Sequence, residues 1–359
     1  ILVDLPIELN EAYIAGLDSG EDKLVKGSGD LFMGTTGGSI KVLTLVAGGK
    51  VFNITGDGSQ NLIFRDCIVA NSAEVGLIKG FSMAFVSIVQ YVGNAKGVIY
   101  EDIKKLLLSN TGWFGGGAPL GNSGTYEKLV GTFGLVQKQG GFSEVSGSSI
   151  GFDVSANPTI TGDAVMEAVV FTGDYPAGYV NRYTNGSYTG YNFNNSWNVR
   201  CAGIPTEGDS SAAGNIYDPS NAGAKTYATN TSGYKVVTNA TTATNLLRFD
   251  SSVSGRLTYK GKKTRAFQIS TSLSFNETSG GNYTTYVFYI VKISANGVTA
   301  IPLPETETFI DTNSGYTQAF PITGSVTLAN NESVEVWLKR LNNGNGRTIN
   351  TLSFNLTAR

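Results

Sequence analysis

The sequence predicts an all-β protein in which a parallel β-helix is followed by a β-sandwich. Three observations predict this fold class. Glycine accounts for 46 of 359 residues and charged residues for only 15%, which is typical of β-proteins with many turns. Near the N-terminus, β-prone runs recur at a regular spacing. The last third of the chain alternates apolar and polar residues and has no helical periodicity.

The β-helix is expected over residues 31–171, after an N-terminal lead-in at 1–30. The runs "IKVLTLVA", "NLIFRDCIV", "SMAFVSIVQ" and "IKKLLLSNT" start at residues 40, 61, 82 and 103, a period of 21 residues. Such a period fits one coil of a β-helix, whose successive coils pair as parallel strands about 4.8 Å apart. One column of this alignment contains Leu43, Phe64, Phe85 and Leu106.

The run "NLIFRDCIV" places Arg65 and Asp66 beside Cys67. A charged pair next to a cysteine is a candidate reactive cluster, because burial and neighbouring charges shift pKa values. In the aligned coils, however, the pair takes the positions of Thr44 and Leu45. We interpret the pair as a bend at which the in-out alternation of the strand shifts, and Cys67 as a packing residue.

A glycine-rich break, "NTGWFGGGAPLGNSG", covers residues 110–124, and shorter β-like runs continue to Phe171. We extend the β-helix over these runs, with a small separate sandwich as the alternative. Residues 172–241 are rich in Tyr, Asn and Gly and poor in aliphatic residues, so this neck needs neighbours to become ordered.

Residues 242–359 contain strand patterns such as "RAFQISTSLSF", "TTYVFYIVKI" and "SVEVWLKR". Phe267, Ile269 and Leu273 share one face of the first of these strands. About eight such strands without a helix pattern predict a C-terminal β-sandwich, most simply a jelly-roll head.

The chain resembles bacteriophage tail fibres and tailspikes, which are receptor-binding proteins. Three features carry the resemblance: the coils at 40–111, the bridge "WNVRCAGIPTEGDSSAAGNIYD" at 197–218, and the run at 245–275, which is similar to the start of trimeric heads of the tumour-necrosis-factor or C1q type. The resemblance implies a homotrimer with right-handed parallel β-helices, an interwoven neck and a compact head that attaches to the host cell. A virion-attachment region cannot be identified in the first residues, and we expect any leader ahead of Ile1 to have been removed or never present.

Composition excludes several kinds of chemistry. The chain has no histidine, so Ser-His-Asp and Cys-His catalysis and histidine-ligated zinc are impossible. The two cysteines, Cys67 and Cys201, form no CxxC motif and are expected to be buried free thiols, with one disulfide between them as the alternative. A net charge of −2 predicts no nucleic-acid binding, and no apolar run is long enough for membrane insertion. We expect no cofactor and no metal site.

The functional expectation is a virion protein that binds a host surface glycan or outer-membrane receptor and contacts other tail proteins. The alternatives are a polysaccharide depolymerase and a bacterial surface adhesin. No catalytic residue is assigned, because no acid pair shares a column in the regular coils, and glycoside hydrolysis uses two carboxylates. The candidate binding residues, chosen as aromatic or amide side chains in the neck and in loops of the head, are Tyr183, Tyr188, Tyr191, Trp197, Asn276, Tyr283, Asn342, Asn343 and Asn345.

Overall fold

The computed structural model describes residues 1–117, 119–218, 224–227, 230–278, 283–341 and 346–359. The chain divides into two compact units, Ile1–Gly208 and Asp209–Arg359. In the described residues there is no α-helix, and the helical elements are three short 3-10 turns. No helix among these residues is long and apolar enough to cross a membrane.

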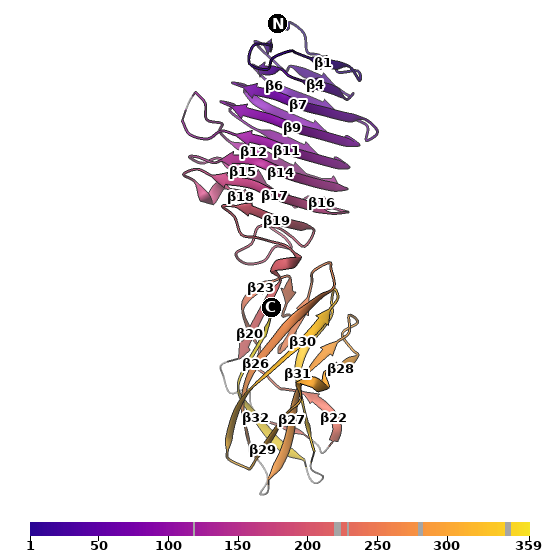
Figure 1. Ribbon diagram of the computed structural model, residues 1–359, viewed down its shortest axis with the longest axis vertical. Coiled ribbons are helices and arrows are strands. Elements are labelled where there is room, and N and C mark those ends of the chain that lie inside the picture. The colour runs from indigo at the N-terminus through magenta and orange to yellow at the C-terminus, as the bar shows by residue number, and fades with distance from the viewer. Residues whose placement is uncertain (118, 219–223, 228–229, 279–282, 342–345) are drawn as a thin grey trace. The chain divides into compact units, whose positions relative to one another are not determined.

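The N-terminal unit is a parallel β-solenoid of about seven turns (Figure 1). Its larger sheet runs in the order β1 (Tyr13–Ala15), β4 (Gly38–Lys41), β7 (Asn61–Ala70), β9 (Met83–Val92), β11 (Lys105–Trp113), β14 (Leu135–Glu144), β17 (Ala164–Thr172) and β19 (Trp197–Ala202), with β2 (Lys23–Lys26) and β5 (Thr44–Ala47) beside it. The second sheet contains β3 (Phe32–Gly34), β6 (Lys50–Thr55), β8 (Glu74–Lys79), β10 (Val98–Glu101), β12 (Thr125–Val130), β15 (Ile150–Asp153) and β18 (Val180–Asn181). A short pair, β13 (Thr132–Phe133) and β16 (Thr159–Ile160), completes the unit.

The structure confirms the parallel coils but corrects their register. Asn61 pairs with Met83 and Met83 with Lys105, a spacing of 22 residues rather than 21. Phe64 therefore lies beside Val86, and Phe85 points outward and is only half-buried. Because strand side chains alternate between faces, a shift of one residue exchanges the inner and outer sets. The column of Leu43, Phe64, Phe85 and Leu106 is therefore wrong.

The interpretation of Asp66 as a bend is confirmed. Asp66 has a positive φ of 56°, and burial in β7 shifts from Leu62 and Phe64 before the bend to Cys67 and Val69 after it. Arg65 Nε and Asp66 Oδ2 form an exposed ion pair at 2.9 Å. Burial raises the pKa of the Cys67 thiol to about 11, so the cysteine packs and is not a reactive thiolate.

The boundaries of the predicted neck differ from those of the structure. Strands β18 and β19 add to the solenoid, so the coils continue past Phe171 to Ala202, whereas β20 (Ala213–Asp218) belongs to the C-terminal unit. Residues 172–241 are thus divided between the two units. The first part can join the solenoid because aromatic rings fill the core in place of the missing aliphatic side chains. The ring centroids of Phe193 and Trp197 lie 4.8 Å apart in the solenoid core.

The C-terminal unit contains two antiparallel sheets. The first consists of β23 (Thr242–Leu247), β20, β32 (Arg347–Ala358), β26 (Arg265–Glu277), β30 (Thr317–Leu328) and β21 (Ala224–Tyr227). The second consists of β24 (Phe249–Asp250), β25 (Arg256–Tyr259), β31 (Ser333–Arg340), β27 (Thr284–Ile293), β28 (Ala300–Pro302), β22 (Asn230–Lys235) and β29 (Thr308–Thr312). Phe267 and Ile269 from one sheet share a core with Phe288 and Ile290 from the other. The expected alternation of Phe267, Ile269 and Leu273 on one face is confirmed.

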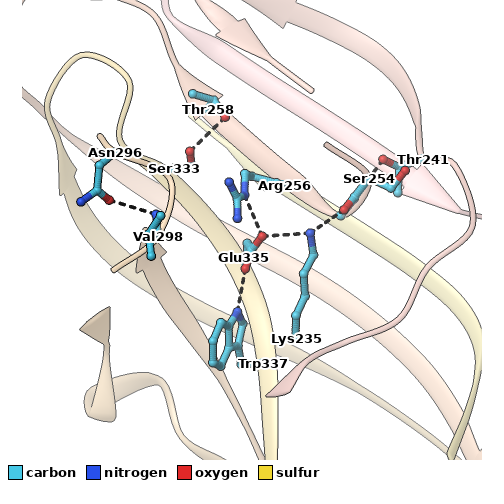
Figure 2. A network of polar contacts seen from close by, with 11 residues as sticks. Lys235, Thr241, Ser254, Arg256, Thr258, Asn296, Val298, Ser333, Glu335 and Trp337 are labelled. Atoms are coloured by element: carbon cyan, nitrogen blue, oxygen red, sulfur yellow. Dashed lines mark hydrogen bonds and ion pairs between the residues drawn. The ribbon is translucent and has the colours of Figure 1, made fainter. Parts of the chain in front are cut away.

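A buried carboxylate organises polar side chains of the C-terminal unit (Figure 2). Glu335 on β31 is 1% exposed and accepts hydrogen bonds from Arg256 at 2.7 Å and Trp337 at 2.7 Å. Lys235 Nζ lies 2.9 Å from the same carboxylate and donates to the Ser254 carbonyl. Burial would raise the pKa of Glu335, but the bonds from Lys235 and Trp337 outweigh it and lower the pKa. The network joins β22, β25 and β31.

Candidate functional site

A polar ladder inside the solenoid fixes the turn that follows the larger sheet. Ser72, Asn94 and Asn122 are buried in successive coils, and the backbone N–H of each of the first two donates to the side-chain oxygen of the next, at 3.1 and 3.0 Å. Asn122 Nδ2 also donates to the carbonyls of Tyr91 and Phe114, at 2.6 and 2.9 Å. Buried amides that are fully hydrogen-bonded hold backbone rigidly. The ladder therefore anchors the surface loop that begins at Phe114.

The turns of three consecutive coils form a surface pocket beside this ladder. We call it the turn pocket. It has a volume of about 400 Å³. Its described lining comes from the loops after β11, β14 and β17, and consists of Gly116, Gly117, Asn122, Ser123, Gly124, Ser146, Gly147, Ser148, Ser149 and Asp174.

Hydrogen bonds between neighbouring coils hold these loops in place. The Gly116 N–H donates to Ser146 Oγ at 2.8 Å, and the Gly115 N–H donates to the Glu144 carboxylate at 3.0 Å. The Gly147 N–H donates to Asp174 Oδ1 at 3.2 Å. Gly116 and Gly147 have φ values of 82° and 64°, a region that favours glycine. The pocket is thus formed by loops that are connected from coil to coil.

The lining chemistry suits a polyhydroxylated ligand. Serine hydroxyls both donate and accept hydrogen bonds, and a carboxylate accepts them, which matches the mixed donors and acceptors of sugar hydroxyls. Phe114 lies two residues before the lining residue Gly116 and Tyr175 directly follows Asp174, and their side chains are 36% and 37% exposed. Aromatic side chains offer large, rigid apolar faces against which a sugar ring can pack.

The pocket lacks the usual groups for glycan cleavage. Asp174 is the one carboxylate among its described lining residues, whereas glycoside hydrolysis generally uses two. Glu144, at the end of β14, accepts a hydrogen bond from the Gly115 N–H at 3.0 Å. Two acids of the second sheet form ion pairs, Glu101 with Lys79 at 2.6 Å and Asp153 with Lys128 at 3.4 Å. Within the described part of the chain, no group of three or more Cys, Asp or Glu residues could hold a metal ion.

Two of the aromatic residues predicted to bind a ligand are core residues. Tyr183 and Trp197 are 1% and 0% exposed, and the Trp197 indole N–H donates to the Tyr183 hydroxyl at 3.0 Å. Tyr183 in turn donates to the Pro158 carbonyl at 2.9 Å. Their assignment as glycan-stacking residues is wrong, because buried rings offer no face to a ligand.

The other predicted residues are at the surface or outside the described residues. Tyr188 and Tyr191 are half-buried between β18 and β19. In the C-terminal unit Asn276 is half-buried and Tyr283 is 78% exposed. Asn342, Asn343 and Asn345 lie outside the described residues.

The structure brings the flanks of the two predicted head loops together. The Thr278 N–H donates to the Thr348 carbonyl at 2.8 Å, and the Leu341 N–H donates to the Thr285 carbonyl at 3.0 Å. Asn276 on β26 is paired with Asn350 on β32. The described flanks of the two segments therefore lie at the same end of the C-terminal unit.

Sequence reasoning did not identify the turn pocket. The available signal was the run "NTGWFGGGAPLGNSG", which we interpreted as a break and which is an insertion within one coil. Lys105 pairs with Leu135 across this insertion, so the coil is 30 residues long. A long insertion in a regular repeat is a common place for a binding loop.

Weak structural similarities to known proteins include a TNF and a phage tailspike domain. No family model and no curated protein matches the sequence. Eiger TNF from S. frugiperda is 10% identical, with a TM-score of 0.28, and the match covers 41% of this chain and 91% of that chain. The crystal structure of the enzymatically active domain of bacteriophage CBA120 tailspike protein 4 is 10% identical, with a TM-score of 0.25. That match covers 98% of this chain but only 63% of the tailspike chain, and similarities at this level define no function.

Proposed function

We propose that the protein is a phage virion tail fibre or tailspike protein that attaches the particle to its host by binding a surface glycan in the turn pocket. The observation that carries this proposal is the pocket itself, which presents serine hydroxyls and Asp174 on loops held between coils. The parallel solenoid and the resemblance of the sequence to tail fibres and tailspikes support placing the protein on a virion.

Binding rather than cleavage is favoured by the carboxylates. One carboxylate lines the pocket, Glu144 beside it accepts from the Gly115 N–H, and Glu101 and Asp153 form ion pairs with lysines. Glycan attachment requires hydrogen bonds and an apolar ring contact but no acid pair.

We also propose that the protein assembles as a homotrimer through the outer face of the larger sheet. Ile63, Phe85 and Leu107 are adjacent in register on this face and are half-buried. The column continues through Gln137 to Val165. Since β-strands expose alternate residues, this outward apolar column adds nothing to the core of the single chain. Association with a second copy would cover it.

Light scattering in solution tests the assembly. We expect three times the mass of one chain, and a smaller mass for Phe85→Lys. Leu77→Lys is the matched control, because Leu77 is also half-buried but lies on the seven-stranded sheet. A monomeric wild-type mass would refute the trimer.

A glycan array of bacterial surface polysaccharides tests the attachment function. We expect the wild-type protein to retain one or a few glycans and Ser148→Trp, which fills the turn pocket, to lose them. Ser28→Trp is the control, because Ser28 is likewise an exposed turn serine but lies in an earlier coil. Equal binding by Ser148→Trp and wild type would refute the site, and an array without any bound glycan would refute glycan attachment.

Two further measurements separate the alternatives. Release of new reducing ends or of an unsaturated product from a bound glycan would identify a depolymerase. Mass spectrometry of purified virions is expected to detect the protein together with other tail proteins. Its detection on the bacterial surface of uninfected cells would identify an adhesin instead.

A further inference from the structure

A second pocket adjoins the turn pocket. We call it the lysine pocket. Its described lining consists of Glu74, Lys96, Gly97, Val98, Ile99, Gly124, Thr125 and Lys128, and its volume is about 310 Å³. Gly124 lines both pockets, and Ser123 and Thr125 on either side of it line one each. The two pockets therefore meet at one short segment of backbone, between a turn and the first residues of the second sheet.

The shared segment is firmly held, so the two pockets have a fixed spacing. The Ser123 N–H donates to the Asn94 carbonyl at 2.9 Å, and its hydroxyl donates to the Ala95 carbonyl at 3.0 Å. Gly124 accepts from the Ile150 N–H at 2.9 Å, while Thr125 accepts from the Gly97 N–H at 2.9 Å. Both ends of the segment are thus bonded to the preceding coil, and its middle residue is bonded to the following coil. A ligand with two rigidly linked units matches two pockets of fixed spacing.

The chemistry of the lysine pocket differs from that of the turn pocket. It combines two cations, Lys96 and Lys128, with one anion, Glu74, and with apolar surface from the half-buried Ile99. Lys96 is exposed and makes no ion pair among the described residues. Such a lining offers an apolar surface to a ring and cationic donors to an acidic substituent.

The neighbouring acids do not neutralise both lysines. Lys128 Nζ lies 3.4 Å from Asp153 Oδ2, and its side chain is 34% exposed. Asp153 also accepts two hydrogen bonds from Ser155, from the backbone N–H at 2.9 Å and the hydroxyl at 2.7 Å. An ammonium group has three donors, so Lys128 keeps donors for a ligand besides this long contact. Glu74 makes no ion pair among the described residues and can accept hydrogen bonds from sugar hydroxyls.

We infer that the two pockets form one groove for an acidic glycan, in which the turn pocket holds a neutral sugar unit and the lysine pocket holds an adjacent unit that carries a carboxylate. This inference rests on the proposed glycan attachment and adds the class of glycan. The acidic group lies between Lys96 and Lys128, and the ring of the same unit packs on Ile99.

The test uses an array that contains acidic bacterial polysaccharides, neutral ones, and acidic ones whose carboxylates have been reduced to alcohols. Every glycan that the wild-type protein retains is expected to be acidic and to be lost after reduction. Binding should also weaken as the NaCl concentration rises, because salt screens exposed charges. Retention of neutral glycans, or equal binding of a reduced glycan, would overturn the inference.

Variants identify the pocket that recognises the acid. We expect Lys96→Gln together with Lys128→Gln to weaken binding of the retained glycan by about five- to tenfold, as expected for the loss of two exposed charge contacts. The matched control is Lys79→Gln with Lys105→Gln. Lys79 also pairs with an acid on the seven-stranded sheet, and Lys105 is exposed on the ten-stranded sheet.

The outcomes separate the two proposals. If Ser148→Trp abolishes binding but the lysine variant binds as tightly as the wild type, glycan attachment stands and the acidic subsite is refuted. If Ser148→Trp has no effect, the turn pocket itself is refuted. Circular dichroism of each variant, compared with the wild type, shows whether a loss of binding reflects a loss of folding.

Discussion

Asp66 and Ile88 lie opposite one another in adjacent coils, and both have left-handed backbone, with φ values of 56° and 54°. The same column includes Val42, Asn110, Gly140 and Ala168, all with positive φ. Six successive coils of the larger sheet therefore bend at one structurally equivalent residue, whereas β19 has no such bend. Asp, Asn and Gly suit such a residue, whereas the β-branched Val42 and Ile88 do not.

Replacing Ile88 with Asn should stabilise the solenoid. Ile88 is 51% exposed, so the substitution removes little core packing, and Asn tolerates left-handed backbone better than Ile. We expect the free energy of unfolding to rise by about 1 kcal/mol, the low end of what strain at such a residue costs. Urea denaturation followed by tryptophan fluorescence measures it.

The control for this substitution is Ile68→Asn. Ile68 faces outward from the same sheet one coil earlier, but its backbone is not left-handed. We expect this variant to be neutral or less stable than the wild type. Equal effects of Ile68→Asn and Ile88→Asn would show that the backbone conformation of Ile88 is not strained.

Removing the side chain of Asn122 should destabilise the turn beneath the proposed pocket. Asn122→Ala leaves the buried backbone N–H of Asn94 without its acceptor and removes a hydrogen bond to the Tyr91 carbonyl, and buried groups that lose a partner are costly. We expect a loss of about 3 kcal/mol in the free energy of unfolding, measured by urea denaturation.

Ser123→Ala is the matched control for Asn122→Ala, because Ser123 is the next residue and is exposed. Its hydroxyl makes one surface hydrogen bond, so its loss should cost less than about 0.5 kcal/mol. A loss of the same size for both variants would mean that the ladder contributes no special stability.

The sequence predicted the parallel coils well because their strands have a regular apolar pattern. It failed on register, since a period of 21 and one of 22 residues both align apolar residues, and only the backbone bend at Asp66 and Ile88 distinguishes them. Each coil that has this bend skips one alternation there, which a simple two-residue pattern does not include.

The candidate site was harder to predict than the fold. Tyr183 and Trp197 were chosen for their aromatic character, but the same property makes them suitable to close the core of the last coils. Composition cannot separate a buried ring from an exposed one. The turn pocket depends on three loops that are about 30 residues apart in sequence and adjacent only because the coils stack.

Removing only the lysine of the buried ion pair in the solenoid should lower the free energy of unfolding more than removing both charges of the pair. Lys138 Nζ and the Glu127 carboxylate lie 2.8 Å apart, with both side chains 1% exposed. Lys138→Met should reduce the free energy of unfolding by about 3–5 kcal/mol, because it leaves a buried carboxylate without its cation. Adding Glu127→Gln should recover part of the loss, since the amide oxygen can still accept from the Trp113 indole N–H, which donates to Glu127 at 3.1 Å.

A double-mutant cycle measures this coupling, and an exposed pair provides the comparison. Lys79 and Glu101 are 2.6 Å apart, but their side chains are 37% and 24% exposed. Lys79→Met should therefore cost less than about 1 kcal/mol. If Lys138→Met cost no more than Lys79→Met, burial would add nothing to the Glu127–Lys138 pair.

The stability of the C-terminal unit should fall in acid because of Glu335. The hydrogen bonds and ion pairs around Glu335 lower its pKa below the usual 4.5, against the effect of burial. A group with a lowered pKa in the folded state stabilises that state fully above its unfolded pKa, and this contribution is lost as pH falls through the folded pKa. We expect the melting temperature of the wild type to decrease below about pH 4.5.

Two variants test this assignment. Glu335→Gln should have a lower melting temperature than the wild type at pH 7, and this temperature should fall less on acidification. Glu305→Gln, which changes an exposed acid, should follow the wild-type curve. Parallel pH curves for the wild type and Glu335→Gln would show that Glu335 is not the group whose protonation destabilises the unit.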